Sequence, residues 1–337
     1  MSRRYRESVT EDPHAGFDRP ARRSRPRTKD RPSYGDAVTA QVVTVDRGRY
    51  RCRLDDGTQV TATKARSLGR KAAIVGDVVK LVGDTSGTEG TLARIVEVTE
   101  RRTVLRRTAD DDDSHERPIV ANADQLVIVA ALADPPPRPG MIDRILVAAY
   151  DAGLEPLLVL TKADLATPDD LIGIYAPLGL HIEVVEPGSD LSSVHEALAG
   201  RHSVLVGHSG VGKSTLVNAL IPGIDRATGE VNDVTGRGRH TSTSAILLEL
   251  PPPGGWVIDT PGVRSFGLSH VTHDSVVAAF GDLAEITADC PRGCSHETGS
   301  VDCALDEAVA DGRLTADRLE SFRRMERAWT TPSYLER

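Results

Sequence analysis

The chain has 337 residues, a hydrophobic fraction of 39%, an aromatic fraction of 4% and a formal net charge of −8 at pH 7, values that fit two or three domains with aliphatic cores. It contains no apolar run of the ~18 residues that a membrane-spanning helix requires and no apolar N-terminal segment typical of a secretory signal, so we expect a cytoplasmic protein that does not bind membranes. The net negative charge by itself argues against a nucleic-acid partner, and the small number of cysteines excludes a disulfide scaffold.

Residues 1–33 are predicted to form a disordered basic arm. Within it, ARRSRPRTKDR at 21–31 holds six Lys or Arg residues against one acid. A segment with so few apolar residues cannot offset the entropy that it would lose on ordering. Two interpretations stay open, a solvated tail and an arm that binds phosphates and becomes ordered on binding.

Residues 34–105 are predicted to form a small closed β-barrel that binds RNA. Strand-like runs recur about every 10 residues and are separated by Gly or Asp-Gly. These runs lie at 36–48, 49–57, 58–65, 73–82 and 90–100. Five strands at this spacing fit an OB-fold, and an SH3-like barrel is the main alternative from the pattern alone. Cys52 lies in one of these runs and is interpreted as an ordinary buried thiol.

After an acidic linker at 110–118, residues 116–268 show alternating strands and helices. The continuous apolar run 125–132 is typical of a strand buried on both faces. In 141–153 the residues Ile142, Ile145, Leu146 and Ala149 share one helical face, and Gly153 suits the C-terminal cap. Further strands are expected at 156–161, 181–185, 202–206, 245–250 and 256–260, and further helices at 168–178, 190–200 and 215–220. This order predicts a parallel, doubly wound α/β sheet with helices on both faces.

The stretch GHSGVGKST, residues 207–215, has the pattern of a phosphate-binding loop between an apolar strand and a helix. Its backbone N–H groups would surround the β-phosphate, and the helix would present its positive N-terminus. Lys213 is expected to bridge the β- and γ-phosphates and Ser214 to hold Mg²⁺. The nucleotide contacts predicted in this loop are Gly207, His208, Ser209, Gly210, Val211, Gly212, Lys213, Ser214 and Thr215.

A D-x-x-G pattern, residues 259–262, ends a later strand. Asp259 is expected to anchor Mg²⁺ through water, and the N–H of Gly262 to meet the γ-phosphate. Between this pattern and the phosphate loop, residues 236–245 have the polar, Gly-rich composition of a switch segment. Thr241 or Thr243 would supply the second Mg²⁺ hydroxyl, and Thr241 is the first choice.

Thr161-Lys162-Ala163-Asp164, the TKAD segment, follows a buried strand where a base-binding loop belongs. The Asp164 carboxylate can accept hydrogen bonds from N1–H and the 2-amino group of guanine, donors that adenine lacks. Lys162 would lie along the base plane. The motif order is therefore guanine reader, phosphate loop, switch threonine and D-x-x-G, a circular permutation of the ordinary GTPase order.

With these motifs the chain resembles the circularly permuted ribosome small-subunit-dependent GTPase A family (RsgA, also called YjeQ). The resemblance also covers RPIVANADQLVIVAA, IDRILVAAYDAGLEPLLVLTKADL, GRHTST and DTPGVRSFGL. It implies an N-terminal OB-fold, a permuted GTPase domain at 116–268 and a C-terminal helical zinc domain at 269–337. It further implies a monomer that binds the 30S subunit and its 16S rRNA late in maturation, hydrolyses GTP to GDP with stimulation by 30S, and changes its ribosome affinity with the nucleotide.

Two positions depart from the family pattern. Thr161 stands where the family commonly has Asn, which predicts weaker guanine binding. The loop that usually carries Ser-Ala has no match, and Glu186 to Ser189 occupy its expected place.

The residue after D-x-x-G is Val263, which cannot orient a water as Gln does in many GTPases. His240 is therefore the candidate catalytic residue, and a purely structural or ribosome-contacting role for it stays open.

Cys290, Cys294, His296 and Cys303 lie within fourteen residues and match a Cys₃His zinc site. Four protein ligands leave no open coordination position, so one structural zinc is predicted. His270 and His273 are alternative ligands. In the family, four residues usually separate the first two cysteines and five separate the His from the last, whereas here the counts are three and six. A different local loop is therefore expected, with the metal retained.

The chain beyond Cys303 is expected to be helical, with Thr315 as an N-cap. The face carrying Arg323, Arg324 and Arg327 would bind RNA or would be simply solvated.

Two other function classes compete with a 30S assembly GTPase. One is a P-loop ATPase or kinase acting on RNA, against which the TKAD and D-x-x-G segments argue. The other is an RNA-binding scaffold with a vestigial nucleotide site, against which the intact Lys213, Ser214 and Asp259 argue.

Overall fold

Alternating apolar residues close the N-terminal strands into a barrel. The computed structural model describes residues 34–69, 73–107, 117–224, 245–260, 268, 271–278 and 280–330. The barrel strands are β1 (Val38–Asp46), β2 (Arg49–Leu54), β3 (Gln59–Lys64), β4 (Val78–Gly83) and β5 (Ala93–Val98), and a short helix η1 (Arg66–Leu68) follows β3. They pair in the order β1-β2-β3-β5-β4, and β4 pairs back onto β1. The predicted five-stranded OB-fold is thus confirmed.

The barrel core consists of every second residue of its strands. Val42, Cys52, Val79, Leu81 and Ile95 are fully buried in it. Successive side chains of a strand point to opposite faces, so this alternation places one set inside and leaves the other set outward. Burial raises the pKa of Cys52 to about 12, so this thiol is neutral and packs as predicted.

Two further strands, β6 (Val104–Arg107) and β7 (Arg117–Ala121), form a separate antiparallel pair that the sequence pattern did not predict. Residues 117 and 118 were expected in the acidic linker and instead begin β7. The buried residues Leu105 and Val120 lie opposite each other in this pair and join the main hydrophobic core.

The central sheet has the predicted doubly wound form. Its strands are β8 (Gln125–Ala131), β9 (Glu155–Thr161), β10 (His181–Val184), β11 (His202–Val206), β12 (Ile246–Glu249) and β13 (Trp256–Asp259). They run in the order β10-β9-β8-β11-β13-β12, parallel except for β12. The helices are α1 (Pro139–Asp151), α2 (Asp169–Tyr175) with η2 (Ala176–Leu178), α3 (Ser192–Leu198) and α4 (Lys213–Leu220).

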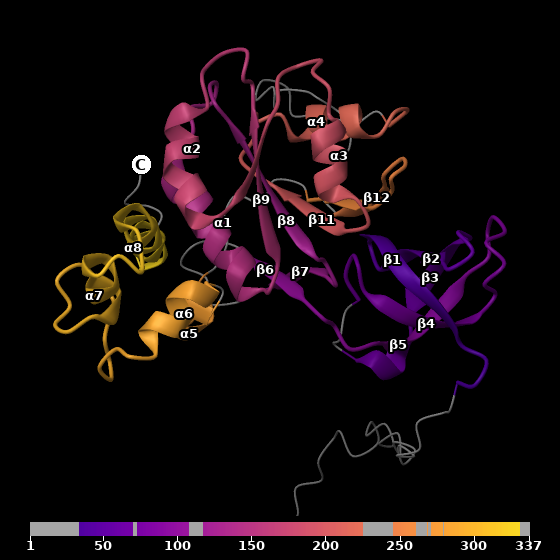
Figure 1. Ribbon diagram of the computed structural model, residues 1–337. Helices are drawn as coiled ribbons and strands as arrows, with labels where there is room; N and C mark the ends of the chain where they lie inside the picture. Colours follow the sequence, from indigo (N-terminus) through magenta and orange to yellow (C-terminus); the bar gives the residue numbers. More distant parts are fainter. Residues whose placement is uncertain are drawn as a thin grey trace, which may run out of the picture. The chain divides into compact units, whose positions relative to one another are not determined.

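Strand β8 is buried on both faces because each face supports a different core. Leu126 and Ile128 pack in the cluster that contains α1 and α2, whereas Val127 and Val129 pack in the cluster that contains α3 and α4. Figure 1 shows the two pairs of helices on opposite sides of the sheet. The continuous apolar run at 125–132 therefore reflects two cores, as expected for a parallel sheet.

The barrel and the central sheet are joined by backbone pairing. Strand β1 pairs antiparallel with β12 at Thr44 and Ile246, so the sheet continues from the central strands into the barrel. The residues from Asp36 to Arg337 form one compact unit. Strand β12 begins directly after the predicted switch segment, so the barrel is attached to the strand nearest that segment.

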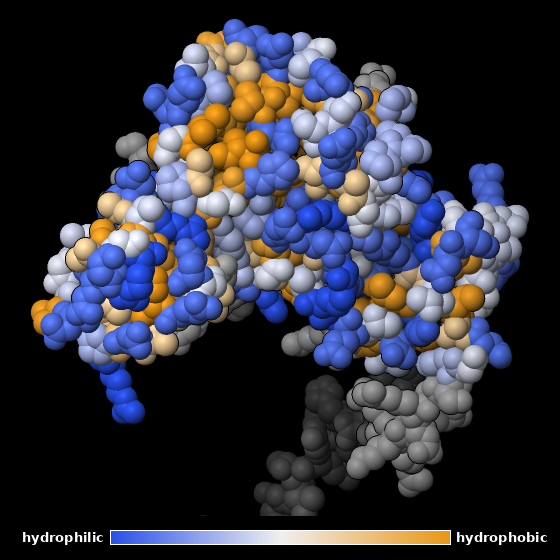
Figure 2. All heavy atoms as spheres, in the orientation of Figure 1, coloured by the Kyte–Doolittle hydropathy of each residue, from blue (hydrophilic) through white to orange (hydrophobic). Residues whose placement is uncertain are grey.

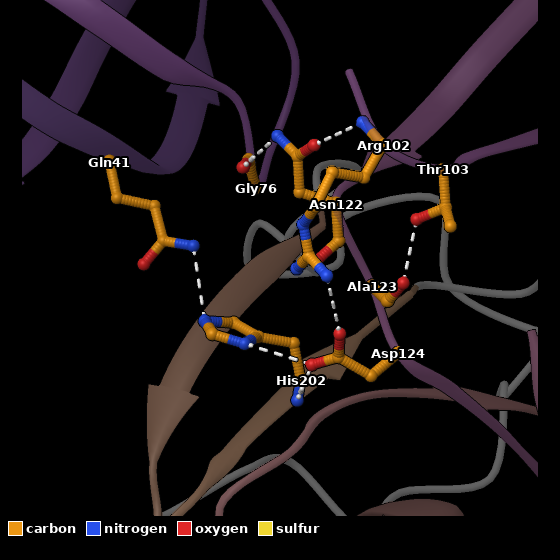
Figure 3. A network of polar contacts seen from close by, with 8 residues as sticks. All are labelled: Gln41, Gly76, Arg102, Thr103, Asn122, Ala123, Asp124 and His202. Atoms are coloured by element: carbon orange, nitrogen blue, oxygen red, sulfur yellow. Dashed lines mark hydrogen bonds and ion pairs between the residues drawn. The ribbon is translucent and has the colours of Figure 1, made fainter. Parts of the chain in front are cut away.

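Side chains reinforce this junction. Figure 3 shows the His202 ring between Gln41 of β1 and Asp124, which precedes β8. Asp124 accepts hydrogen bonds from the His202 backbone N–H at 2.9 Å and from Arg102 at 3.1 Å. Burial lowers the pKa of His202, and the Asp124 carboxylate opposes that effect. The Arg53 guanidinium of β2 lies 4.8 Å from the ring of Trp256 on β13.

The C-terminal part is helical, as predicted, with α5 (His273–Ala278), α6 (Gly281–Thr287), α7 (Ala304–Ala310) and α8 (Ala316–Thr330). The Thr315 hydroxyl accepts a hydrogen bond from the Arg318 N–H at 3.2 Å, which confirms the predicted N-cap. Phe322 of α8 packs against Phe280, and Phe280 packs against Tyr150 of α1.

The arginines of α8 correct an expectation. Arg323 is buried and pairs with Asp306, and Arg324 pairs with the buried Asp143. Only Arg327 is substantially exposed, and it pairs with Glu320. These three arginines therefore do not form the basic RNA-facing or solvated surface that their spacing predicted, because tertiary contacts supply Arg323 and Arg324 with carboxylates and Arg327 pairs within its own helix.

The face of the molecule drawn in Figure 2 is mostly polar, with hydrophobic side chains gathered between α2 and α3. Leu165, which precedes α2, and Val184, the last residue of β10, are among the exposed large hydrophobic residues. None of the helices in the described part of the chain is both long enough and apolar enough to cross a membrane.

Candidate nucleotide site and metal centre

The parallel strands bring the predicted nucleotide motifs to one edge of the sheet. Strands β8 and β9 end together, with Ala131 opposite Thr161, and β13 ends at Asp259 opposite Leu205 of β11. The phosphate loop follows β11, and the TKAD segment begins with the last residue of β9. Ligands of doubly wound sheets bind at this carboxyl edge.

The phosphate loop has the backbone that its glycines permit. Gly207 lies so close to β8 that a Cβ atom there would be 2.3 Å from the Val129 carbonyl oxygen. Gly212 has φ +93° and stands at the N-cap of α4. A side chain at Gly207 would displace the loop from β8, and one at Gly212 would strain a left-handed backbone, so both glycines shape the N–H groups that lead into the helix.

Lys213 lies across the loop. Its Nζ donates hydrogen bonds to the carbonyls of Gly207 at 2.6 Å and His208 at 2.7 Å. Burial lowers the pKa of Lys213, and the Asp259 carboxylate opposes this shift. Asp259 itself is buried, and the adjacent Thr260 hydroxyl donates to the Leu205 carbonyl at 2.8 Å. A half-buried cation and a buried carboxylate thus lie at the end of strands β11 and β13, an arrangement suited to a polyphosphate with a divalent cation.

Thr161 connects the TKAD segment to the phosphate loop. It is buried, and its hydroxyl donates to the Val211 carbonyl at 2.6 Å and lies 3.3 Å from the Ala130 carbonyl oxygen. The sequence pattern predicted weaker guanine binding with Thr161 than with the family's common Asn. In the structure the Thr161 hydroxyl contacts the loop that lies 50 residues further along the chain.

The other TKAD residues are less buried than Thr161: Lys162 and Ala163 are half-buried, and Ala163 packs against the main core. Lys162 has φ +61°, and its ammonium group contacts the Asp134 carbonyl in the loop after β8. Asp164 is exposed and accessible to a ligand. The turn at 186–189 follows β10, and the neighbouring Val185 carbonyl accepts a hydrogen bond from the Ala163 N–H at 3.3 Å. The loop that stands in place of the family's Ser-Ala loop therefore lies beside the TKAD segment.

Sequence reasoning did not identify two residues of this edge. Asp134 supplies the carbonyl that Lys162 contacts, and Thr260 ties the end of β13 to β11. The only signal for Asp134 was its place two residues after the apolar run at 125–132. A backbone carbonyl carries no sequence signature, so this partner emerged only from the fold.

Several predicted residues lie outside the described part of the chain. They are Thr241, Thr243, His240, Gly262, Val263 and His270, together with the basic arm at 1–33. The predictions made for these residues, and the roles predicted for Ser209, Gly210, Ser214 and Thr215, stay predictions.

The four predicted zinc ligands lie together. The ligand atoms of Cys290, Cys294, His296 and Cys303 are all within 4.8 Å of one another. The His296 Nδ1 lies 3.6 Å from the Cys290 Sγ and 3.9 Å from the Cys303 Sγ. Tetrahedral zinc, with bonds of about 2.0 to 2.3 Å, separates such ligand atoms by roughly 3.5 to 3.8 Å. The residues therefore fit a zinc ion.

The local chemistry agrees with this fit. Burial, with the neighbouring Cys303 and Cys294, raises the pKa of the Cys290 thiol to about 11. A metal ion reverses such a shift, because it binds the thiolate and releases its proton. The loop that holds His296 is supported by Arg323, which donates to the His296 carbonyl at 2.8 Å.

Comparison with known proteins agrees with the motifs. A family model described as RsgA GTPase matches residues 98–269, which is more than half of the chain. The chain belongs to the RsgA GTPase family. It is 38% identical over 273 residues to the "Small ribosomal subunit biogenesis GTPase RsgA" of Azotobacter vinelandii, an alignment that covers 78% of this chain and 77% of that protein.

Other relatives of the family are similar over a shorter stretch. A protein of the same description from Pseudomonas aeruginosa is 44% identical over 216 residues, 61% of this chain, and the chain spans 63% of its length. Among solved structures, YjeQ from Thermotoga maritima matches with a TM-score of 0.63 at 26% identity, over 86% of this chain and 97% of that chain. The fold and the family resemblance predicted from the motifs are therefore confirmed.

Proposed function

We propose that this protein is an Mg²⁺-dependent GTPase that acts in maturation of the small ribosomal subunit. The observation that supports the proposal most is the hydrogen bond between Thr161 and Val211, because it joins the TKAD segment to the loop at 207–215. The names of the relatives, which describe small ribosomal subunit biogenesis GTPases, support the same activity.

In this proposal the nucleotide lies along the carboxyl edge of the sheet. Asp164 accepts from N1–H and the 2-amino group of guanine, and Lys162 lies along the base. Lys213 leaves the loop carbonyls that it contacts now and bridges the β- and γ-phosphates. Ser214 and Thr241 would hold Mg²⁺ and Asp259 would hold it through water, and the ion would neutralise charge on the phosphates. The N–H of Gly262 would meet the γ-phosphate. Water attacks the γ-phosphorus, the bond between that phosphorus and the β–γ bridging oxygen breaks, and GDP and inorganic phosphate are released.

Val263 offers no hydrogen bond to that water, so intrinsic hydrolysis is expected to be slow. We propose that His240 orients the water when the 30S subunit is bound. His240→Ala should retain GTP binding and lose the 30S-stimulated turnover. If stimulated turnover is unchanged, His240 has no part in hydrolysis.

The other parts supply ribosome contacts. We propose that the barrel, about residues 34–105, contacts 16S rRNA, as small barrels bind RNA backbones. The region 269–337, with one structural zinc held by the Cys₃His cluster, provides a second contact, and the nucleotide state sets the affinity for 30S. The protein would act as a monomer in the cytoplasm, where its proposed partner is located. The basic arm at 1–33 has no assigned role.

The test is GTP hydrolysis with and without purified 30S subunits, together with competition between GTP and ATP. The proposal expects a guanine preference and a turnover that 30S increases. Lys213→Met is the matched negative control, because it removes the phosphate-binding ammonium group. A preference for ATP would favour an RNA-acting ATPase or kinase, and absence of nucleotide binding would favour an RNA-binding scaffold; either result contradicts the proposal.

A further inference from the structure

We infer that Arg324 and Tyr175 are positioning residues for guanine recognition. Through these two residues, helix α8 of the zinc-binding region holds α1 and α2, the helices that flank the TKAD segment. This inference rests on the proposed function of that segment. Helix α8 lies far from the TKAD segment in sequence, but a short series of contacts connects the two. These contacts begin where α8 packs against α2, the helix that follows TKAD, and against α1, the helix that precedes β9.

Helix α8 first completes the end of α2 and η2. The Ser321 hydroxyl donates to the Ile174 carbonyl at 3.2 Å, and the Arg318 guanidinium donates to the Pro177 carbonyl at 3.0 Å. The last carbonyls of a helix have no partner within that helix, so outside donors satisfy them. Side chains of α8 therefore cap the helix that emerges from the TKAD segment.

Arg324 then binds α1. Its Nε donates to the Asp143 Oδ2 at 3.0 Å and its Nη2 to the Oδ1 at 3.3 Å. The Asp143 side chain is almost fully buried, and burial raises its pKa while Arg324 opposes the shift. A buried carboxylate without a cation is costly, so this pair fixes the position of α1 against α8.

Tyr175 carries the contact toward the nucleotide edge. Its ring is fully buried, the Arg324 guanidinium lies 5.1 Å from the ring centroid, and its hydroxyl donates to the Pro139 carbonyl at 2.9 Å. Pro139 is the first residue of α1 and follows the loop that contains Asp134. The Asp134 carbonyl contacts the Lys162 ammonium group. The path from Arg324 to the TKAD segment is thus Tyr175, Pro139 and the 134–138 loop.

These contacts matter for binding because guanine selection needs Lys162 and Asp164 held in place before the nucleotide arrives. Ordering a loop during binding lowers affinity, and a preorganised loop avoids that loss. A looser contact at Tyr175 or Arg324 should therefore weaken recognition of the base. The phosphate loop is also held by β11, which pairs with β8, and by the close approach of Gly207 to Val129, so phosphate contacts should be affected less.

The experiment measures the affinities of GDP, inosine diphosphate and ADP by calorimetry on the full chain, with zinc content and thermal unfolding measured in parallel. Inosine diphosphate lacks the 2-amino group that Asp164 reads, so the ratio of its affinity to that of GDP reports base recognition. The variants are Tyr175→Phe, which removes only the hydroxyl, and Arg324→Met. Arg313→Met is the matched control, because Arg313 forms an exposed ion pair with Asp311.

Tyr175→Phe and Arg324→Met should each bind GDP about fivefold to tenfold more weakly than the wild type, a factor that is ordinary for coupling between two sites. Both should also discriminate less between GDP and inosine diphosphate. Arg313→Met should match the wild type. Wild-type GDP affinity and discrimination in folded, zinc-containing Tyr175→Phe and Arg324→Met would overturn the inference alone. An equal loss for all three nucleotides would also overturn it, as a structural effect. A wild type that does not prefer GDP to ADP would overturn the proposed function as well.

Discussion

The Thr161 hydroxyl donates a 2.6 Å hydrogen bond to the backbone carbonyl of Val211, in the middle of the phosphate loop. The two residues lie 50 positions apart in the chain. The family's common Asn is absent at position 161, and the smaller threonine makes this link with its single hydroxyl. The first residue of the TKAD segment therefore ties this segment to the loop at 207–215.

Replacing Thr161 by valine tests this link. Valine has the same shape but no hydroxyl, so the buried Val211 carbonyl loses its donor at a cost of about 1–3 kcal/mol. We expect a lower melting temperature and GDP affinity reduced about tenfold in Thr161→Val, measured by thermal unfolding and calorimetry. Thr161→Ser keeps the hydroxyl and is the control. Equal behaviour of the valine and serine variants would show that the hydrogen bond contributes nothing.

Removal of the metal tests the Cys₃His cluster. A ligand that binds only the folded state stabilises it by about 4 kcal/mol when present at ~1,000 times its Kd. We expect one zinc per chain by elemental analysis, a lower melting temperature after chelation, and loss of the zinc in Cys294→Ser. Cys52→Ala is the matched control, because this thiol is buried in the barrel away from the cluster, and it should retain one zinc. Zinc retained by Cys294→Ser would exclude that residue as a ligand.

Asp124 is expected to stabilise the junction between barrel and central sheet. Its replacement by alanine removes the acceptor of the His202 N–H and one of two acceptors of the Arg102 guanidinium, which also donates to the Asn122 carbonyl. The expected loss in the free energy of unfolding is about 2 kcal/mol, within the usual range for a part-buried acceptor, measured by urea denaturation. Asp84→Ala removes an exposed turn aspartate and should change stability little. A loss no larger than that control would mean that water replaces Asp124 at the junction.

Glu326 should make stability depend on pH. Burial raises its pKa from 4.5 to about 8, an effect that Arg323 opposes and Glu297 reinforces. Between pH 4.5 and about 8 the unfolded chain releases a proton that the folded chain retains. The stability that the protonated group contributes is thus complete below pH 4.5 and is lost as the pH rises toward 8.

Glu326→Gln imitates the protonated side chain and should remove that loss. We expect it to raise the free energy of unfolding at pH 8 by an amount on the order of a few kcal/mol, and to change it little at pH 4.5. Glu320→Gln, on the same helix but in an exposed ion pair, is the control. A melting temperature of Glu326→Gln that follows pH in the same way as the wild type would refute this assignment.

Much of the fold and of the candidate sites was predictable because the sequence patterns that indicate them lie within short stretches of the chain. The helix at α1 followed from the shared face of Ile142, Ile145 and Leu146, and the buried strand β8 from its unbroken apolar run. The backbone at positions 207 and 212 requires glycine, so the phosphate loop could be predicted from its sequence motif. The cysteine cluster was equally readable, since its four ligands lie close in sequence.

Contacts between distant segments were not predictable in this way. The arginines at 323 and 324 read as a basic surface, and the fold instead gives them Asp306 and Asp143. The pairing of β1 with β12, and the strand pair β6 and β7, depend on backbone hydrogen bonds that any residue can make. Their partners are selected by the packing of the whole sheet rather than by side-chain type.

The sequence alone therefore determined the class of the protein: a barrel, a permuted nucleotide-binding sheet and a Cys₃His cluster, each encoded by short periodic patterns or closely spaced motifs. The tertiary structure alone decided that Thr161 holds the phosphate loop and that Arg324 and Tyr175 lead from α8 toward the TKAD segment. The physical reason is that a hydroxyl, a guanidinium or a carbonyl accepts many partners, and only the folded chain brings one of them within hydrogen-bond distance.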